Sequence, residues 1–389
     1  MKWNLFNKQM SRRQFCKLCL YSGATMAVSP LIMDLFNTSV QANENNAGMG
    51  FINTKEAMYY EKIDEKTIQC HLCPRNCVLS DGMRGFCRAR EPKGGKHYSL
   101  VYGNPTAVHV DPIEKKPLFH FLPATTAFSI ATAGCNFRCK YCQNWQISQY
   151  GPEETVNDYM PPEDVARQAK SYNCPTIAYT YTEPSIFYEY MLDTAKIAKI
   201  QGIRNMYHSN GSLNPEPAEE LSLYLDAADI DLKGFTQEFY SSVCEGYLEA
   251  VLNTLKILKK NKVWLEITNL VIPTLNDDFG EIREMCVWIK ENLGPDTPVH
   301  FSRFVPQYKL TNLYATPVST IEKAREIAMA AGLNFVYIGN VPGNLAESTY
   351  CPKCKKPVIR RVGYAVLEIN LDSQGRSKCC GYPIPGVWS

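Results

Sequence analysis

Short apolar segments rich in β-branched and aromatic residues alternate with helical periodicity between residues 126 and 342. The strand-like segments are AFSIATA, TIAYTY, NMYHS, DIDL, VWLEITNLVI, PVHFSRF and NFVYI. Several intervening segments begin with Pro and acidic residues, and the last two end at Gly, as helices typically do. We predict helices over residues 161–172, 184–200, 215–228, 281–294 and 320–332. This alternation predicts an α/β fold with a parallel sheet, either a barrel or an open doubly wound sheet.

Polar residues follow or close six successive strands of the predicted sheet. In parallel sheets and barrels, reactive groups collect at the carboxyl ends of the strands. We therefore expect one rim to gather the following residues, given in chain order: Cys135, Glu183, Ser209 with Asn210, Asp231 with Lys233, Asn269, and His300 with Arg303.

Three cysteines lie within nine residues in GCNFRCKYCQNW, directly after the first predicted strand. A structural zinc site needs four ligands, and no fourth Cys or His follows nearby. A disulfide among Cys135, Cys139 and Cys142 would close a very small loop and leave an odd thiol. Three thiolates on one loop can instead hold three irons of a cubane and leave the fourth iron open. The spacing therefore favours an iron–sulfur cluster with an open coordination site.

The pattern Cys-x3-Cys-x2-Cys, with an aromatic residue before the last Cys, resembles the signature of radical S-adenosylmethionine (radical SAM) enzymes. The segments YTYTEPSIFYEY, HSNG, DIDLKGF, EITNLVIPTLND, HFSRFVPQYKL, YIGNVPGN and TYCPKC extend the resemblance. Together they resemble the AmmeMemoRadiSam-system radical SAM enzymes, which are relatives of pyruvate formate-lyase activating enzymes. The implied fold is an incomplete (β/α)6 TIM-like barrel.

The resemblance implies a 4Fe–4S cluster and S-adenosylmethionine as cofactors. One electron from the reduced cluster would cleave S-adenosylmethionine to methionine and a 5′-deoxyadenosyl radical. That radical would take a hydrogen atom from the substrate, while the protein positions the cofactor and excludes water. The same kinship implies a protein or peptide substrate and a one-electron donor of flavodoxin or ferredoxin type.

The resemblance also implies roles for single residues around the cysteine loop. Tyr141 would pack near the adenine. Glu183 stands in TYTEP, where relatives often carry Gly-Gly-Glu-Pro, and would accept hydrogen bonds from the methionine ammonium. A structural alternative for Glu183 is a cap on the helix that begins at Pro184.

Further implied roles fall on later strand ends. Ser209 and Asn210 would meet the ribose or carboxylate, and Asp231 would also belong to the cofactor site. Catalytic roles are implied for Lys233, His300 and Arg303. The structural alternatives are an ion pair between Asp231 and Lys233, and a core position for His300.

A second cysteine group stands in CHLCPRNCVLSDGMRGFCRAR, with ligands at Cys70, Cys73, Cys77 and Cys87. Structural zinc and an auxiliary 4Fe–4S cluster both accept four thiolates, and the spacing does not choose between them. At this point we favour zinc or a purely structural role.

A third group pairs Cys351 and Cys354 in CPKC with Cys379 and Cys380 in SKCCG. Two such pairs about 25 residues apart predict a zinc ribbon. Relatives tend to carry Cys-x-x-Cys-Gly, which would place a cysteine at Ser377. Because adjacent cysteines chelate one ion awkwardly, either Cys379 moves in as the fourth ligand or this site has lost its metal.

The N-terminal segment resembles a twin-arginine export signal. It contains SRRQFCK with Arg12 and Arg13, then LCLYSGATMAVSPLIM, then the small-residue pattern VQA. The apolar run is short and broken by Ser, Gly and Pro, which argues against a membrane anchor, and we predict no stable membrane span. We expect export to the periplasm, the alternative being a cytoplasmic protein.

These observations predict five parts in the chain. They are a signal (1–42), a polar linker (43–65), a Cys-rich module of short hairpins (66–125), the barrel (126–342) and a Cys-rich zinc-ribbon-like module (343–389).

The charge pattern excludes a nucleic-acid-binding class. Lys and Arg total 41 and Asp and Glu total 39, a net charge of +2, with no basic run interleaved with aromatics. The alternative to an enzyme is an iron–sulfur electron-transfer or scaffold protein that never cleaves S-adenosylmethionine. The polar rim favours the enzyme, because a pure electron carrier has no need for it.

Overall fold

The structure, a computed structural model, describes residues 38–39 and 48–389. The predicted signal over residues 1–42 lies outside these ranges except for β1 (Thr38–Ser39), and so does the first part of the predicted linker, 43–47. The described residues from Ser39 onward belong to one compact unit.

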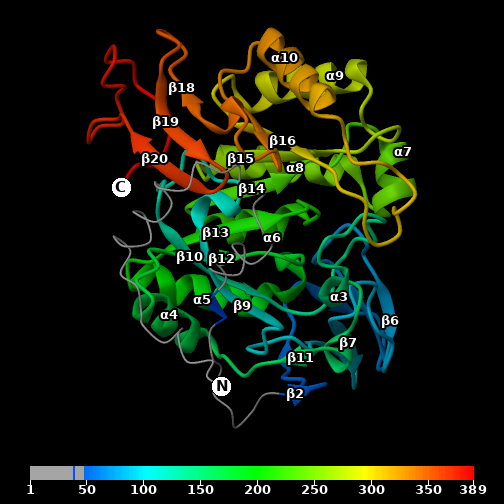
Figure 1. Ribbon diagram of the computed structural model, residues 1–389. Helices are drawn as coiled ribbons and strands as arrows, with labels where there is room; N and C mark the ends of the chain where they lie inside the picture. Colours follow the sequence, from blue (N-terminus) through cyan, green and yellow to red (C-terminus); the bar gives the residue numbers. More distant parts are fainter. Residues whose placement is uncertain (1–37, 40–47) are drawn as a thin grey trace, which may run out of the picture. The chain divides into compact units, whose positions relative to one another are not determined.

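A large sheet forms the centre of this unit (Figure 1). Within residues 48–389 its strands lie in the order β9-β10-β12-β13-β14-β15-β16-β17. Strands β10 to β17 pair in parallel, and β9 runs antiparallel to β10. The bounds are β9 Ala107–Pro112, β10 Thr126–Ala131, β12 Thr176–Tyr179, β13 Arg204–Ser209, β14 Ala227–Asp231, β15 Trp264–Val271, β16 Val299–Arg303 and β17 Val336–Gly339. Each predicted strand is confirmed, and the parallel sheet fits a partial TIM-like barrel.

Helices connect these parallel strands, as expected for strand–helix alternation. They are α4 (Pro162–Ser171), α5 (Tyr188–Ile200), α6 (Pro215–Ser222), α8 (Leu248–Lys260), α9 (Phe279–Leu293) and α10 (Val318–Ala331). Shorter helical turns are η2 (Ile113–Lys115), α3 (Trp145–Ser148), η3 (Pro152–Glu154), η4 (Pro184–Phe187), α7 (Gln237–Phe239), the π-helix η5 (Tyr240–Cys244) and η6 (Leu345–Glu347). No helix in the described part of the chain has both the length and the apolar character needed to cross a bilayer.

Two helix predictions need correction. The helix predicted over 215–228 ends at Ser222, because Ala227 and Ala228 are fully buried and begin β14 beside β13. Helix α8 was not predicted. Its signal was present, since Val251, Leu255 and Leu258 recur at helical spacing and all three are buried in the core.

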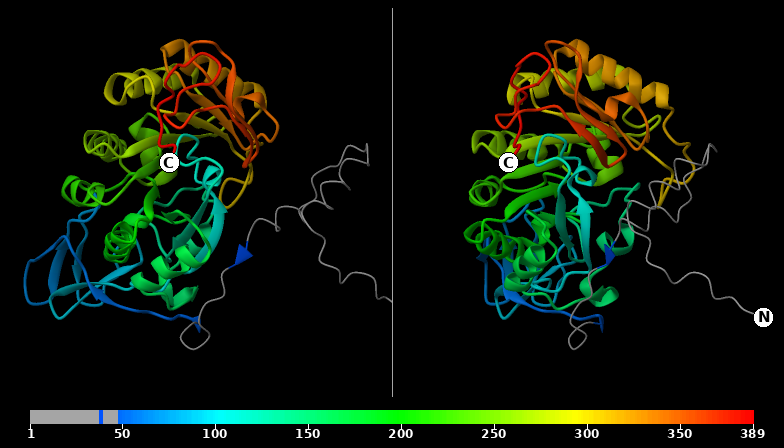
Figure 2. Two further views of the ribbon diagram at one scale, coloured as in Figure 1. Left: turned by 90° about the vertical axis from the view of Figure 1, so that its left-hand side faces the viewer. Right: turned by 60° about the vertical axis from the view of Figure 1, so that its left-hand side comes forward.

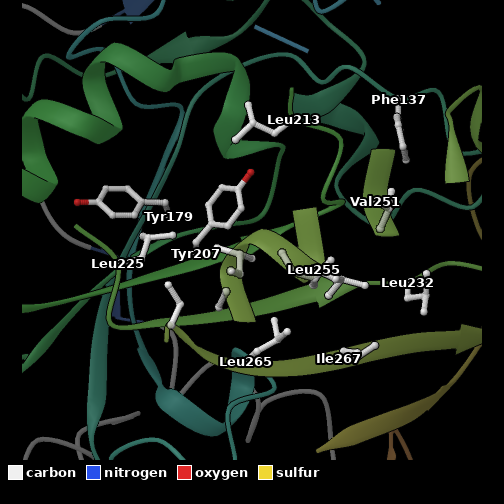
Figure 3. Packing of buried hydrophobic residues seen from close by; sticks show 14 of the residues in the cluster. Phe137, Tyr179, Tyr207, Leu213, Leu225, Leu232, Val251, Leu255, Leu265 and Ile267 are labelled. Atoms are coloured by element: carbon white, nitrogen blue, oxygen red, sulfur yellow. The ribbon is translucent and has the colours of Figure 1, made fainter. Parts of the chain in front are cut away.

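The core packs between the sheet and its covering helices. Figure 3 shows Val251 and Leu255 of α8 above Leu265 and Ile267 of β15. Phe137, from the cysteine loop that follows β10, belongs to the same cluster and is 1% exposed. The cysteine loop is therefore anchored in the main core.

Short antiparallel sheets form the region before β9. One sheet has the order β4-β5-β6 and the other β3-β8-β7. Their bounds are β3 Lys55–Glu56, β4 Tyr60–Lys62, β5 Thr67–Cys70, β6 Val78–Ser80, β7 Arg90–Lys93 and β8 Lys96–Ser99, while β2 Gly48–Met49 pairs with β11 Val156–Asn157. Strands β3 and β4, from the later part of the linker predicted over 43–65, pair with β8 and β5 in these sheets.

The C-terminal residues form a third small sheet of β18 (Thr349–Tyr350), β19 (Pro357–Val362) and β20 (Ala365–Ile369). Figures 1 and 2 show these red strands and the blue N-terminal strands on different sides of the unit. The final residues are held by His120, whose Nδ1 lies 2.6 Å from the carbonyl oxygen of Pro385.

Candidate functional site

The central cysteines lie on the loop between β10 and α3. Cys139 is buried, and Cys135 and Cys142 are half-buried. The π-helix η5 holds the middle of the loop, because Arg138 N–H donates to the Cys244 carbonyl (2.8 Å) and Lys140 N–H to the Val243 carbonyl (3.0 Å). The loop thus reaches its conformation through contacts far away in the sequence.

Glu183 is the centre of a buried hydrogen-bond group at the ends of β12 and β13. Its Oε1 accepts from the Ser209 hydroxyl (2.8 Å) and the Ser185 N–H (2.9 Å), and its Oε2 accepts from the Asn210 N–H (2.8 Å). The Tyr207 hydroxyl lies 3.3 Å from Oε1. The structure therefore unites Glu183, Ser209 and Asn210, and it also places Glu183 as the N-cap of η4.

Asn210 connects this group to the cysteine loop. Its side-chain amide donates to Oδ1 of Asn136 (2.8 Å) and lies 3.9 Å from the Cys135 sulfur. Asn136 in turn donates to the Ser212 carbonyl (2.8 Å). The ends of β12 and β13 thus meet the loop that follows β10, as the strand-end rule predicts.

Asp231 and Lys233 form a second polar group at the end of β14. Lys233 Nζ lies 3.0 Å from Asp231 Oδ2 and 5.8 Å from the centre of the Tyr141 ring. His208 of β13 joins them, with Nε2 3.5 Å from Asp231 and Nδ1 3.6 Å from Asp229. Burial by itself would raise the pKa of Asp231, but Lys233 and His208 hold that pKa below its usual value. Asp231 is therefore an anion beside a cation that faces Tyr141.

Asp229 lies one layer deeper in the same strand. Burial, and next the Asp231 charge, raises the pKa of Asp229 well above its usual value. The pKa values of the two carboxyls are therefore shifted in opposite directions, that of Asp229 upward and that of Asp231 downward.

His300 and Arg303 of β16, both expected at the rim of the sheet, lie near opposite ends of the strand in different surroundings. Arg303, at the carboxyl end, is half-buried and donates from Nε to the Thr316 carbonyl (2.8 Å). His300 is near the start of the strand, fully buried, with Nε2 2.7 Å from Oε2 of Glu266. Glu266 also accepts from the backbone N–H groups of Phe119 (3.0 Å) and His120 (2.8 Å). His300 is therefore a buried residue paired with Glu266, as in the alternative that gave it a core position. Its catalytic role stays a prediction.

The structure adds residues to the site that sequence reasoning missed. Cys244 is fully buried, and its sulfur lies 3.4 Å from the Tyr141 hydroxyl. His208 precedes the predicted Ser209 and bridges two strands. His208 was detectable as a polar residue near a strand end, but nothing local marks Cys244, because about 100 residues separate it from the loop.

Comparison with known proteins defines the family. The sequence model of the radical SAM superfamily matches residues 129–286, which contain the cysteine loop and the ends of β12, β13 and β14. An uncharacterized protein of Methanocaldococcus jannaschii is 47% identical over 331 residues, 85% of this chain and 98% of that relative. The chain belongs to the radical SAM superfamily.

Other proteins are similar to this radical SAM protein at lower sequence identity. The pyruvate formate-lyase-activating enzyme of Clostridium pasteurianum is 24% identical over 160 residues, 40% of this chain and 66% of that enzyme. A radical SAM methyltransferase from Sphaerobacter thermophilus aligns with a TM-score of 0.45 and 14% identity, covering 80% of this chain and 82% of that one.

The donor atoms of this radical SAM loop fit the cluster that the family implies. Cys135, Cys139 and Cys142 supply three thiols on one loop. Burial raises the pKa of the Cys135 thiol well above its usual value, so a thiolate there needs a bound cation. The N–H of Phe137 donates to the Cys135 sulfur over 3.3 Å, and Ser148 Oγ lies 3.1 Å from the Cys142 sulfur. Such hydrogen bonds stabilise thiolate ligands of iron.

The C-terminal cysteines form a compact group. The ligand atoms of Cys351, Cys354, Cys379 and Cys380 all lie within 4.8 Å of one another. A hydrogen bond from the Tyr382 backbone helps to lower the pKa of the Cys380 thiol to about 7. The four thiols lie close enough to bind a single metal ion, and Cys379 is one of the four.

Proposed function

We propose that this radical SAM enzyme reductively cleaves S-adenosylmethionine and uses the resulting radical on a protein or peptide. Cys135, Cys139 and Cys142 would hold the 4Fe–4S cluster. When bound and reduced, the cluster supplies the electron that splits the sulfonium into methionine and a 5′-deoxyadenosyl radical, which then removes a hydrogen atom from the substrate. The observation that carries the proposal is the contact of Asn210 with both the cysteine loop and Glu183.

The polar groups would bind and orient the two ends of the cofactor. Glu183 Oε2 accepts one protein hydrogen bond and keeps a lone pair for the methionine ammonium. Lys233 presents a cation that would bind the methionine carboxylate, and Asp231 holds that cation in place over 3.0 Å. Tyr141, buried between Lys233 and Cys244, would pack against the adenine.

A protein or peptide substrate is supported by the activating-enzyme relative. The name of that relative describes an enzyme that activates pyruvate formate-lyase, which is a protein. Anaerobic co-purification followed by mass spectrometry of modified residues would identify the partner. A hydrogen-abstraction product on a small metabolite only would contradict this part of the proposal.

The test of S-adenosylmethionine cleavage is anaerobic reconstitution, reduction with dithionite and quantification of 5′-deoxyadenosine. We expect product from the full chain and none from a variant with Cys135→Ala, Cys139→Ala and Cys142→Ala. Cys286→Ala is the matched control, because Cys286 is buried in α9 and belongs to none of the three cysteine groups. An intact cluster without 5′-deoxyadenosine would favour the electron-transfer or scaffold alternative.

We also propose that the chain is exported by the twin-arginine route. The support is the sequence pattern around Arg12 and Arg13. This route carries proteins already folded around cofactors, which agrees with a cluster enzyme.

A further inference from the structure

The thiols of the N-terminal cysteine group surround one cavity. Cys70, Cys73, Cys77 and Cys87 all line it, together with Arg75, Phe86, Arg90 and His97. Cys70 ends β5, and its N–H donates to the Cys77 carbonyl over 2.9 Å. The turns that carry Cys73, Cys77 and Cys87 therefore close over the end of one strand, and the four side chains face a common interior.

The spacing of these sulfur atoms differs from that in the C-terminal group. One zinc ion holds its thiolates about 3.8 Å apart, because each Zn–S bond is about 2.3 Å and the geometry is tetrahedral. The four C-terminal thiols are close enough to share one ion, because their sulfur atoms all lie within 4.8 Å of one another. Across residues 48–389, no three of the N-terminal four do so. In an iron–sulfur cluster each thiolate binds a different iron, so its ligands lie farther apart.

Unpaired donors in the cavity wall indicate a missing acceptor. His97 is fully buried, and among the described residues its ring nitrogens meet only the backbone of Glu91, without the geometry of a full hydrogen bond. Nη2 of Arg75 is also buried there without a partner. A buried donor left unpaired costs about 1–3 kcal/mol, so such groups usually have a ligand or water as partner. Cluster sulfides and bound thiolates are acceptors of this kind.

We propose that Cys70, Cys73, Cys77 and Cys87 hold a second 4Fe–4S cluster. This replaces the zinc that the sequence alone led us to favour. The second site adjoins the first, because Cys135 N–H donates to the Cys87 carbonyl (3.2 Å) and Arg75 Nε donates to the Asn136 carbonyl (3.3 Å). Arg138 of the central loop also donates to the carbonyl of Phe86.

The test is a count of iron, sulfide and zinc in anaerobically reconstituted full-length protein. We expect about eight irons per chain, and about four in the Cys135→Ala, Cys139→Ala, Cys142→Ala variant. Adding Cys73→Ala and Cys87→Ala should remove the remaining iron and leave zinc unchanged. Cys286→Ala should change neither metal. The proposal would be overturned if the triple variant contained zinc that disappears when Cys73 and Cys87 are also replaced. It would also be overturned if these cysteines bound no metal.

A second measurement needs no variant and so does not depend on the folding of one. In the Mössbauer spectrum of the full chain, added S-adenosylmethionine should perturb the iron of one cluster and leave the other unchanged. After reduction, the two clusters should show magnetic interaction in the electron paramagnetic resonance spectrum. If the protein held a single cluster and all of its iron responded to S-adenosylmethionine, only the inference of a second cluster would be overturned. If it held two clusters and no iron responded to S-adenosylmethionine, only the proposed function would be contradicted.

Discussion

The backbone N–H of Cys135 donates a hydrogen bond to the carbonyl oxygen of Cys87 over 3.2 Å. These residues belong to different cysteine groups, 48 positions apart along the chain. The contact depends on Gly134, whose φ is +100° and whose missing side chain leaves room for the same carbonyl. A Cβ atom at position 134 would overlap the Cys87 oxygen.

We therefore expect Gly134→Ala to damage both cysteine groups at once. The variant combines a disfavoured backbone conformation with a backbone overlap and should lower the free energy of unfolding by about 3 kcal/mol or more. Denaturant unfolding and iron content would measure the effect. Gly202→Ala is the matched control, because Gly202 also has positive φ (+73°) but nothing within 4 Å of the added atom, so its cost should be about 1 kcal/mol. Equal losses in the two variants would contradict the importance of the contact.

Glu183→Gln should destabilise the fold and weaken cofactor binding. Every protein group that faces the carboxylate is a hydrogen-bond donor. In Gln an NH2 group replaces one carboxylate oxygen, so it would face another donor instead of an acceptor. We expect the free energy of unfolding to fall by about 1–3 kcal/mol. Glu249→Gln, at an exposed position of α8, should change it by less than about 0.5 kcal/mol. Unchanged stability and unchanged affinity for S-adenosylmethionine would exclude both roles of Glu183.

Acid should lower the free energy of unfolding through His120. Burial lowers the pKa of His120 from 6.5 to about 4. The unfolded chain therefore binds the proton first, so stability falls as the pH drops from about 6.5 to about 4 and is unaffected by this group above that range. Over this range the loss should approach about 3 kcal/mol. His120→Gln, which keeps a donor and an acceptor but does not titrate, should reduce this part of the pH dependence, as measured by unfolding at pH 4.5 and 7. The same pH dependence in both proteins would contradict the assignment.

The C-terminal cysteines should bind one zinc ion. The sulfur atoms of Cys354 and Cys379 lie 2.7 Å apart and those of Cys351 and Cys380 lie 3.5 Å apart. We expect Cys379→Ser to lower the zinc content from about one per chain to none and to lower Tm. Elemental analysis and thermal unfolding would measure both quantities. Zinc retained in Cys379→Ser would show that Cys379 is not a ligand, and Cys286→Ala again serves as control.

Changing Arg12 and Arg13 to Lys should keep the protein in the cytoplasm. The twin-arginine route reads this pair, and the substitution preserves charge. Cell fractionation and immunoblotting of the two forms would measure the distribution. An unchanged distribution would count against the export signal.

Much of the site could be predicted because it rests on spacing along the chain. The strand-end rule placed Cys135, Glu183, Asn210 and Lys233 near one another, since carboxyl ends of parallel strands share one edge. The same rule applied less well to His300, which lies near the start of its strand and pairs with Glu266. Local spacing also missed Cys244, which reaches Tyr141 only through the packing of the π-helix against the loop.

The sequence by itself determined the order of strands and helices, the three cysteine groups and the family, because each depends on the period and spacing of neighbouring residues. Only the tertiary structure decided how far apart the sulfur atoms lie in each group. Those distances depend on turns and contacts that join distant segments, such as Cys87 with Cys135. The same long-range packing gave Glu183 its four donors.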